Sequence, residues 1–442
     1  MNRNHETQMK TVDVTASVAE HARELDADDE LRGFRQEFIF PRREDGTAKR
    51  YFCGNSLGLQ HRSVAGTVEE VLASWQERAV DGHFAGKHPW LTYHEQLREG
   101  QAALLGAAPE GIVTMNTLTV NLHLAMVSFY RPRGKRRKIL IEKQAFPSDR
   151  YAVESQLRWH GLDPASCLVE MAPEPGQRLL DEARVDDFLQ TQGDEVALVL
   201  WPGVQYVTGQ AFDLPRIAQA ARRAGARIGF DLAHSAGNVP VQLDHSDCDF
   251  AAWCTYKYLN AGPGAVAGLY IHQRHWGRSD LPRFHGWYGN DPSSRFRMSA
   301  EFQPADGAEA WVLSNPPVLA MAPLMASLEV FRRAGFNRLL RKSLAMTSWL
   351  AQQVELNFDD ILQIITPSQP ERRGCQLSLR VRAGPDAGKI LFKFLTAEGV
   401  VTDWREPDVI RVAPVPLYNS YQDCWQLLDA VARWANSTVL AG

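Results

Sequence analysis

Short apolar runs of five or six residues recur through the middle of the chain. The runs lie at 138–142, 167–171, 196–201, 227–231, 250–254 and 266–271. Stretches with apolar residues at helical spacing, such as 183–190 and 214–224, separate several of these runs. Strands that are nearly all apolar are typical of a sheet that helices cover on both faces, and the alternation with helices predicts a mainly parallel sheet of the α/β class.

Two further helices are predicted before this region. Residues 1–50 are polar and weakly patterned, but from Val64 to Trp75 apolar residues recur at the spacing of one helix face. The run 118–129 is also apolar and follows Asn116 and Thr117, which are residue types that favour the start of a helix.

The pattern changes from Pro316 onward. A long helical region extends to about Asn357, and a strand at 376–381 and a helix near 422–434 follow it. This order of elements predicts a second, smaller α+β domain. We expect the larger domain at 60–315 and the smaller domain at 1–59 together with 316–442.

Composition and charge exclude several classes of partner. Of the 442 residues, 45% are hydrophobic and 23% are charged, which is the balance of an ordinary globular protein. The 48 basic residues against 52 acidic ones give a net charge of −4, so no nucleic-acid partner is expected. The longest apolar stretch, 196–204, is far shorter than the ~18 residues of a membrane helix, so no membrane partner is expected.

The cysteines and histidines predict neither disulfides nor a metal site. No C-x-x-C pair occurs, and His272, His275 and His285 have no partner residues at zinc spacing. The first thirty residues mix charges without an apolar signal core, so a cytoplasmic protein with reduced thiols is expected. The cysteines are Cys53, Cys167, Cys248, Cys254, Cys375 and Cys424.

Three predicted strands end in polar residues that could form a ligand site. The strand at 138–142 leads to 145–149, the strand at 227–231 leads to His234, and the strand at 250–254 leads to 255–258. Ligands of open parallel sheets bind outside the carboxyl ends of the strands. We therefore expect the site at this edge of the sheet.

A first candidate motif is Gly54-Asn55-Ser56-Leu57-Gly58, which matches the G-x-S-x-G pattern of serine hydrolases. That chemistry requires Ser56 on a tight turn after a central strand. The fifty residues upstream cannot supply the strands that such a sheet needs, so a glycine-rich turn near a ligand is the better interpretation. A serine hydrolase using Ser56 stays an alternative.

A second candidate is Gly262–Ala267, which satisfies the dinucleotide pattern G-x-G-x-x-A. A dinucleotide-binding loop must follow a strand and open a helix. This segment leads instead into the predicted strand that ends at Ile271, so the pattern does not indicate a dinucleotide site.

A third constellation is Asp231 and Lys257 at consecutive strand ends, with His234 beside the aspartate. Pyridoxal phosphate chemistry requires a lysine that binds the cofactor covalently and a carboxylate that keeps the pyridine nitrogen protonated. Lys257 follows an apolar strand and precedes a glycine-rich turn, which is an unusual place for a surface lysine. The three residues together indicate a pyridoxal phosphate site.

Seven stretches in this order resemble the kynureninase family. They extend over nearly the whole chain, so the resemblance is specific, and it implies a fold-type I pyridoxal phosphate enzyme. In that fold a large domain with a mainly parallel seven-stranded sheet carries a smaller α+β C-terminal domain, and two chains form a homodimer with shared active sites. The stretches are YFCGNSLG at 51–58, NTLTVNLH at 116–123, AFPSD at 145–149, FDLAH at 230–234, YKYLNAG at 256–262, SNPP at 314–317 and IRVAPVPLY at 410–418.

The resemblance implies roles for residues around the cofactor ring. Lys257 would bind the cofactor, Asp231 would pair with the pyridine nitrogen, and His234 would support this region. Phe146 would stack on the ring, within a segment that also includes Pro147, Ser148 and Asp149. The catalytic residues would be Lys257, Asp231 and Tyr256, with Tyr256 as the proton donor.

The resemblance also implies how the cofactor phosphate and the substrate are held. Leu118 and Thr119 would bind the phosphate at a helix start, where backbone amides are free. Tyr256, Trp287 and Asn315 would complete the phosphate site, some of them from the partner subunit. On the substrate, Arg411 would bind the carboxylate, and the aryl end would contact His83, Tyr288 and Asn315.

The implied activity is hydrolysis of the Cβ–Cγ bond of L-kynurenine, of its 3-hydroxy form, or of both. The products would be anthranilate or 3-hydroxyanthranilate and L-alanine, in tryptophan degradation through the kynurenine pathway or in NAD biosynthesis. One departure is Pro202, where the family often has a hydroxyl residue. The alternative within the fold is a cysteine desulfurase-like lyase, but Cys375 lies in a strand-like run rather than in a loop.

Overall fold

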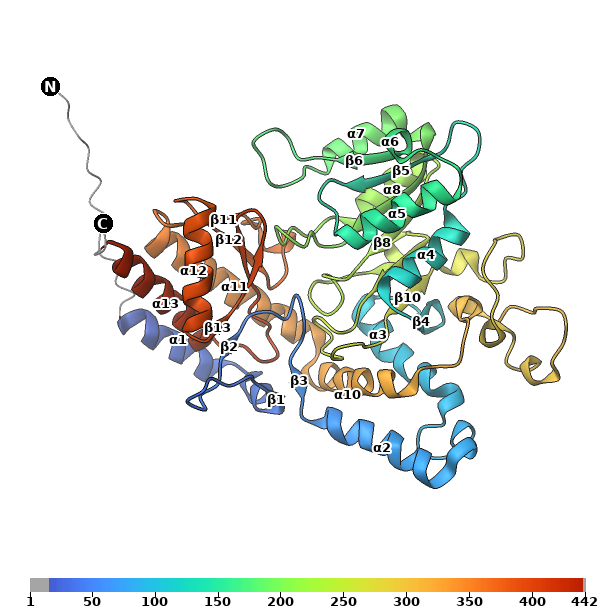
Figure 1. Cartoon of the computed structure of the whole chain (residues 1–442), viewed down its shortest axis with the longest axis horizontal. Coiled ribbons are helices and arrows are strands. Elements are labelled where there is room, and N and C mark those ends of the chain that lie inside the picture. Colours follow the sequence, from blue (N-terminus) through green and yellow to red (C-terminus); the bar gives the residue numbers. More distant parts are fainter. Residues whose placement is uncertain (1–15, 440–442) are drawn as a thin grey trace.

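The computed structural model describes residues 16–439, so residues 1–15 and 440–442 of the expected smaller domain lie outside the described part. A seven-stranded sheet forms the centre of the larger part of the molecule (Figure 1). The expected α/β class with a seven-stranded sheet is confirmed. In spatial order the strands are β4 (Ile112–Thr114), β10 (Gly268–Ile271), β9 (Phe250–Trp253), β8 (Arg227–Asp231), β7 (Val196–Pro202), β5 (Lys138–Glu142) and β6 (Leu168–Met171).

The sheet is mainly parallel, as predicted. Strands β5 to β9 pair in parallel, whereas β10 lies antiparallel to both β9 and β4. The predicted strand limits agree at both ends for β5 and β8. β4 is absent from the sequence prediction because three residues are too few to establish a strand period.

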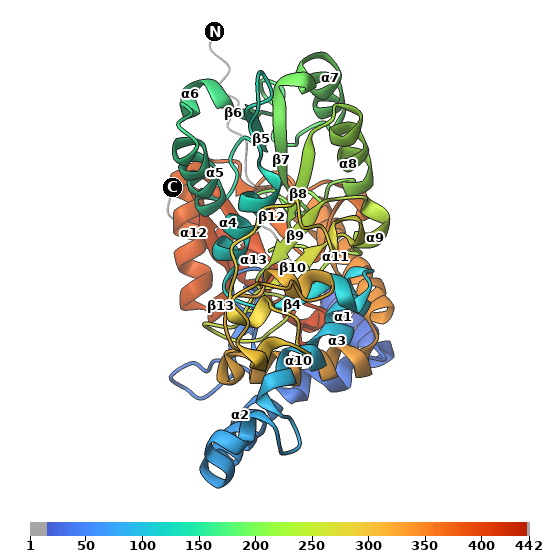
Figure 2. The same cartoon turned by 90° about the vertical axis from the view of Figure 1, so that its right-hand side faces the viewer.

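Helices cover both faces of this sheet, as Figure 2 shows, with α4 to α6 on one side and α7 to α9 on the other. On β5, Leu140 therefore packs into one core, whereas Ile139 and Ile141 pack into the opposite one. Burial on both faces explains why these strands are apolar at successive positions. The helices are α4 (Leu118–Phe129), α5 (Pro147–Trp159), α6 (Pro164–Cys167), α7 (Ala183–Gln192), α8 (Leu214–Arg223) and α9 (Leu243–Ser246).

A second, four-stranded sheet lies in the C-terminal part of the chain, orange to red in Figure 1. Its core also receives Ala22 and Phe52 from the N-terminal segment. The division into two domains at 59/60 and 315/316 stays a prediction. The strands and helices here are β11 (Leu362–Ile364), β12 (Leu377–Val381), β15 (Val409–Val412), β14 (Asp403–Arg405), α1 (Ala16–Asp28), α11 (Phe336–Phe358), α12 (Pro385–Ala397) and α13 (Tyr421–Val439).

The predicted helical region from Pro316 to Asn357 consists of two helices, α10 (Val318–Ala334) and α11. Gly335 separates them with a φ of +77°, which glycine adopts at no steric cost and which interrupts a right-handed helix. α10 packs against α2 (Ser63–Arg78) and α3 (Arg98–Leu105) of the larger part, whereas α11 packs against the smaller sheet. No helix within residues 16–439 is long and apolar enough to span a membrane.

The segment between α1 and α2 runs along the smaller sheet. Its strand β2 (Arg50–Tyr51) pairs in parallel with β13 (Val400–Val401), and Cys53 bridges to Ala413 just after β15. β1 (Phe38–Ile39) pairs with β3 (Gln60–His61). These pairings hold the glycine-rich loop 54–58 against β14 and β15.

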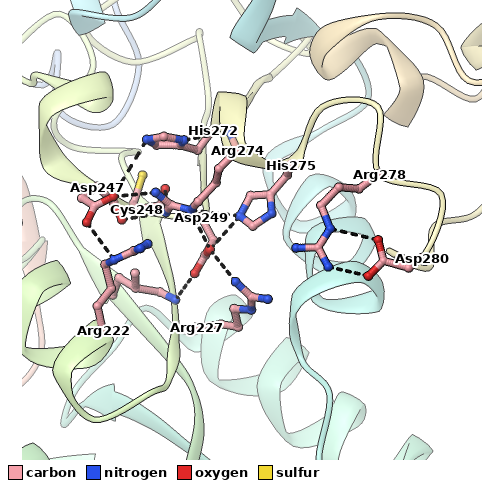
Figure 3. A network of polar contacts seen from close by, with 11 residues as sticks. Arg222, Arg227, Asp247, Cys248, Asp249, His272, Arg274, His275, Arg278 and Asp280 are labelled. Carbon is pink, nitrogen blue, oxygen red and sulfur yellow. Dashed lines mark hydrogen bonds and ion pairs between the residues drawn. The ribbon is translucent and has the colours of Figure 1, made fainter.

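A buried polar network joins the starts of β8 and β9, at the edge of the larger sheet opposite to the carboxyl ends (Figure 3). Asp249 accepts a hydrogen bond from the backbone N–H of Ile228 at 2.8 Å and lies 2.7 Å from His275 Nε2, with Arg227 and Arg274 also paired to it. Burial opposes ionisation of Asp249, but His275 and the arginines outweigh it and lower the pKa of this carboxyl. The network fixes the two strands whose opposite ends lead into the candidate site.

Candidate functional site

A cavity of about 140 Å³ lies at the carboxyl ends of β5, β7 and β8 and beside the loop that follows β9. Its position is the one predicted for a ligand site of a parallel sheet. Most of the expected cofactor-binding residues line it together. They are Leu118, Thr119, Phe146, Ser148, Asp149, Asp231, His234, Tyr256 and Lys257.

Two helices begin at this cavity. α4 begins at Leu118, directly after Thr117 in an extended conformation, and α5 begins at Pro147. Thr119 Oγ1 and Ser148 Oγ, one from each helix start, lie 3.4 Å apart. The first backbone N–H groups of a helix have no partner within the helix, so two such starts and two hydroxyl groups suit a phosphate.

Three buried carboxyl groups lie at the inner end of the cavity. Asp231, at the end of β8, accepts a hydrogen bond from the backbone N–H of Ala233 at 2.8 Å. Burial and the charge of Asp231 raise the pKa of Asp149 well above its usual value, so its protonated carboxyl donates a hydrogen bond to Asp231. Burial and Asp231 also raise the pKa of Glu142 at the end of β5. Only part of this acidic cluster is therefore ionised at neutral pH.

Lys257 faces these acids from the loop after β9. Its Nζ lies 5.9 Å from the centre of the Phe146 ring and 6.0 Å from that of Tyr256, and no hydrogen bond or ion pair engages it within residues 16–439. Burial and the charge of Lys257 lower the pKa of His234, so this imidazole is neutral, and its buried Nδ1 has no partner in the described part of the chain. Burial also raises the pKa of Tyr256, which keeps its hydroxyl protonated.

Arg411 is turned into the molecule and is only 1% exposed. It lies directly opposite Asp403 on the neighbouring strand β14, and the two side chains form an ion pair. Its guanidinium also donates to the carbonyl of Tyr206 at 2.8 Å, and Tyr206 lines the cavity. Strand alternation by itself gave no reason for this inward orientation, which follows from the partners that Asp403 and Tyr206 provide.

The remaining expected site residues do not line this cavity. His83 and Asn315 line a separate apolar hollow, and Trp287 lies on the surface at 37% exposure. Tyr288 is fully buried and donates its hydroxyl to the carbonyl of Leu91. Pro147 is the first residue of α5 beside the cavity. The roles expected for all of these residues stay predictions.

Pro202 ends β7 and lines the cavity without a donor group. The neighbouring backbone N–H of Gly203 donates to the carbonyl of Asp231, so it is not free to replace the missing hydroxyl. Glu142, Tyr206 and Asp403 belong to this region and were not predicted as site residues. Glu142 could have been predicted, because it is the last residue of a predicted strand at the ligand-binding edge of the sheet. Asp403 could not, because its contact with Arg411 depends on the pairing of β14 with β15.

The residues around the cavity fit pyridoxal phosphate. They offer an unpaired lysine, a buried carboxylate, an unpartnered imidazole nitrogen, an aromatic ring and two helix starts. Lys257 would bind the aldehyde carbon, Asp231 the pyridine nitrogen, and the helix starts the phosphate.

Curated relatives identify the family. A kynureninase of Stenotrophomonas maltophilia is 54% identical over 94% of this chain and 98% of its own length. A kynureninase of Xanthomonas campestris is also 54% identical, over 94% of this chain and 97% of its own length. The chain belongs to the kynureninase family. The family model described as the kynureninase C-terminal domain matches residues 339–431, which include most of α11 and the smaller sheet. The predicted resemblance to kynureninases is thus confirmed.

Solved structures extend the likeness of this kynureninase-family chain to the fold. A cysteine desulfurase from Escherichia coli matches with a TM-score of 0.73 at 19% identity, over 92% of this chain and 98% of its own. A C-DES mutant with glycine covalently linked to its pyridoxal phosphate cofactor matches with a TM-score of 0.72 at 19% identity. This match covers 90% of the present chain and 98% of the C-DES chain. At such low identity these structures show the fold-type I architecture alone, which confirms the expected fold.

Proposed function

We propose that the chain catalyses hydrolytic cleavage of the Cβ–Cγ bond of L-kynurenine, its 3-hydroxy form, or both, to L-alanine and anthranilate or 3-hydroxyanthranilate. The observation that carries the proposal is the cavity in which Lys257 faces Asp231, in a chain 54% identical to kynureninases over nearly its whole length. The activity belongs to tryptophan degradation. Six free, buried cysteines suit a cytoplasmic enzyme.

The cofactor of this proposal is pyridoxal phosphate, which when bound supplies the electron sink for carbon acid chemistry. The Nζ of Lys257 would hold it, and the same side chain is placed at the cavity to move the proton at Cα of the substrate. The carboxylate of Asp231 would keep the pyridine nitrogen protonated. The protonated carboxyl of Asp149 supports that charge by donating a hydrogen bond to Asp231.

Tyr256 is the proposed proton donor at Cβ after the carbon–carbon bond has broken. Burial raises the pKa of its hydroxyl, so the proton stays on Tyr256 until a strongly basic carbon takes it. Lys257 Nζ lies 6.0 Å from the centre of the Tyr256 ring, and both residues line the cavity. General acid–base help of this kind accelerates reactions by about 10²–10⁴-fold.

We also propose that two copies of the chain form a homodimer with shared active sites. Trp75 is 59% exposed and Phe84 is 63% exposed, which is unusual for large apolar side chains on a monomer. Aromatic contacts connect Phe84 through Phe296 to Trp287. We define this surface as the aromatic patch. It consists of Trp75, Phe84, Trp287, Phe296 and Leu319.

The aromatic patch supports sharing because expected site residues lie on it or beside it. His83 and Asn315 line the same hollow as Trp75, away from the cavity that Lys257 lines in the same chain. A partner that covers the patch would receive these side chains at its own cavity. This arrangement accounts for phosphate and substrate residues that one chain does not bring to its own site.

The two alternative activities lack support. A cysteine desulfurase needs a nucleophilic thiolate, but every cysteine here is buried, and burial raises the pKa of Cys375 to about 12. A serine hydrolase needs a histidine at its serine, but Ser56 donates to Asp403 at 2.7 Å and accepts from Arg411 at 3.0 Å. Neither residue is activated for attack.

The proposal is tested by the absorbance and covalent chemistry of the purified holoenzyme. The protein should be yellow, and borohydride should fix the cofactor on the peptide that contains Lys257, with loss of activity. The Lys257→Ala variant should show no fixed cofactor. Colourless protein, or a cofactor fixed on another lysine, would contradict the assignment.

A further inference from the structure

The guanidinium of Arg411 is held on nearly all sides. Nε donates to Asp403 Oδ1 at 2.6 Å, and Nη2 donates both to Asp403 Oδ2 and, at 3.0 Å, to Ser56 Oγ. Nη1 donates to the Tyr206 carbonyl at 2.8 Å. A guanidinium has five N–H groups. One N–H on Nη1 is therefore left without an acceptor within residues 16–439.

These contacts divide the guanidinium into two edges. Asp403 occupies the edge formed by Nε and Nη2 with both of its oxygens, which is the two-pronged geometry of a strong arginine–carboxylate pair. The other edge, between Nη1 and Nη2, carries the contact to the uncharged Ser56 hydroxyl. A second carboxylate can be bound in the same two-pronged way only at this other edge.

We propose that Asp403 is a positioning residue, which fixes Arg411 so that the Nη1–Nη2 edge faces the cavity and binds the α-carboxylate of the substrate. The inference rests on the proposed function, because it takes the substrate carboxylate as the ligand of Arg411. Asp403 is suited to this task because cross-strand register sets it directly opposite Arg411 and its side chain is only 19% exposed. It acts through Arg411 and does not touch the substrate.

Ser56 completes this arrangement. Its hydroxyl donates to Asp403 Oδ2 at 2.7 Å and accepts from Arg411 Nη2 at 3.0 Å. When a substrate carboxylate arrives, it replaces Ser56 Oγ as the acceptor of this Nη2 hydrogen, and the hydrogen bond that Ser56 donates to Asp403 stays. The Gly54–Gly58 loop thus has a role without serving as a nucleophile elbow.

The charges near Arg411 make the proposal easy to distinguish from simple charge neutralisation. Arg405 shares Asp403 at 3.1 Å, so two guanidinium groups meet one carboxylate and one positive charge remains for the substrate. Removing Asp403 leaves more positive charge at the site. If charge alone mattered, the substrate would bind more tightly, whereas loss of positioning weakens binding.

The test compares Asp403→Ala and Asp403→Asn with the wild-type holoenzyme. We expect Asp403→Ala to raise the KM for L-kynurenine at least about tenfold, which is the effect of one misplaced charge-assisted hydrogen bond, with kcat reduced less than about threefold. Asp403→Asn keeps one acceptor oxygen for Nε, so its KM should lie between those of wild type and Asp403→Ala. If the alanine variant does not fold, the asparagine variant carries the test.

A second readout does not depend on turnover. Titration of the bound cofactor with L-alanine, which has the same α-carboxylate, should show a parallel loss of affinity in Asp403→Ala. In the Arg411→Ala background, adding Asp403→Ala should weaken L-alanine binding less than about twofold further, because Asp403 acts through Arg411. Full additivity of the two losses would overturn the proposal.

Asp408→Ala is the matched control. Asp408 is a buried aspartate between β14 and β15 that also pairs with two arginines, Arg178 at 2.6 Å and Arg380 at 2.9 Å. Its loss should lower Tm and leave both the KM for L-kynurenine and the affinity for L-alanine within about twofold of wild type. An equal rise in KM in Asp408→Ala would show that Asp403 is only structural.

The outcomes separate this inference from the proposed function. If wild type binds L-alanine but does not cleave L-kynurenine, the proposed function fails, and the L-alanine titration still decides the role of Asp403. If wild type cleaves L-kynurenine and Asp403→Ala has an unchanged or lower KM, the positioning role is wrong. Normal KM in Arg411→Ala would also overturn it.

Discussion

At the residue scale, the chemistry of the cavity depends on which of its buried carboxyl groups carry protons. Burial together with the charge of Asp231 raises the pKa of both Asp149 and Glu142, which favours the protonated form of these two carboxyl groups. A single carboxylate is what the pyridine nitrogen of the proposed cofactor requires.

The raised pKa of Asp149 predicts unequal losses of activity for two similar substitutions, Asp231→Asn and Asp149→Asn. Asp231→Asn should still bind the cofactor but reduce kcat by about 10²-fold or more, because an amide cannot stabilise the protonated pyridine. Asp149→Asn should reduce kcat much less, because an amide resembles the protonated carboxyl and can still donate a hydrogen bond to Asp231. Steady-state kinetics give kcat for each variant, and cofactor absorbance shows whether each variant binds the cofactor. Equal losses of kcat in the two variants would show that Asp149 is also ionised in the working enzyme.

Residues at strand ends could be predicted from the sequence, whereas partners across strands could not. Lys257 and Asp231 follow apolar runs, so the sheet edge on which they lie was evident before the structure. Asp403 is eight residues from Arg411 in the sequence, and only the register of β14 with β15 makes them neighbours. Such pairing depends on the tertiary fold, which short-range patterns do not contain.

At the scale of elements, Glu309 joins three segments beside the aromatic patch. It lies in the short helix Gly307–Trp311, accepts from Arg98 at the start of α3 at 2.6 Å, and pairs with Arg295 at 3.2 Å. The guanidinium of Arg295 in turn lies 4.1 Å from the centre of the Tyr288 ring. Glu309 therefore stabilises the turn that carries Trp287 and Tyr288.

The pH dependence of stability tests this role. Burial opposes ionisation of Glu309, but the nearby His94 and the hydrogen bond and charge of Arg98 outweigh it and lower the pKa of Glu309 to about 2. A carboxyl whose pKa falls on folding stabilises the folded protein at pH values above its unfolded pKa. The free energy of unfolding of Glu309→Gln should therefore be lower than that of wild type by up to about 3 kcal/mol at pH 7. Thermal unfolding of variant and wild type should converge as pH falls from about 4.5 toward 2.

Glu329→Gln is the control for this prediction. Glu329 forms an exposed ion pair with Arg332 at 2.6 Å, and such pairs contribute less than about 1 kcal/mol. Its Tm should therefore stay close to that of wild type at every pH. If the difference in Tm between Glu309→Gln and wild type does not become smaller as the pH falls, then packing, and not charge, accounts for the lower stability of the variant.

The elements themselves follow from the sequence where their pattern is long enough. α4 extends over the predicted residues 118–129, because its apolar positions and its start signal agree. The break at Gly335 went unpredicted because helical spacing continues on both sides of it, and only the different packing of α10 and α11 turns the chain there.

At the scale of the whole molecule, the aromatic patch and the cavity belong to one proposed dimeric enzyme. The sequence pattern gave no sign of the patch, because Phe84 lies far from Trp287 along the chain and folding alone connects the two through Phe296. The hollow that contains His83 and Asn315 has a volume of about 460 Å³ and is mostly apolar in its lining residues. It is the surface that the proposed partner would cover.

Mixing two inactive variants tests whether the sites are shared. When Lys257→Ala and Asn315→Ala chains exchange subunits, half of the dimers are mixed and one site in each is complete, so about a quarter of wild-type activity should return. The control pair is Lys257→Ala with Arg411→Ala, which both belong to the site of one chain and should restore nothing. Equal behaviour of the two mixtures would contradict shared sites.

The central claim is that this chain hydrolyses kynurenine by means of Lys257, and product analysis tests it most directly. Purified holoenzyme incubated with L-kynurenine in ¹⁸O-labelled water should release anthranilate and L-alanine in equal amounts, with one labelled oxygen in the anthranilate carboxylate. The Lys257→Ala variant should release neither. Absence of anthranilate from the wild-type reaction, or its release at the same rate by Lys257→Ala, would contradict the account.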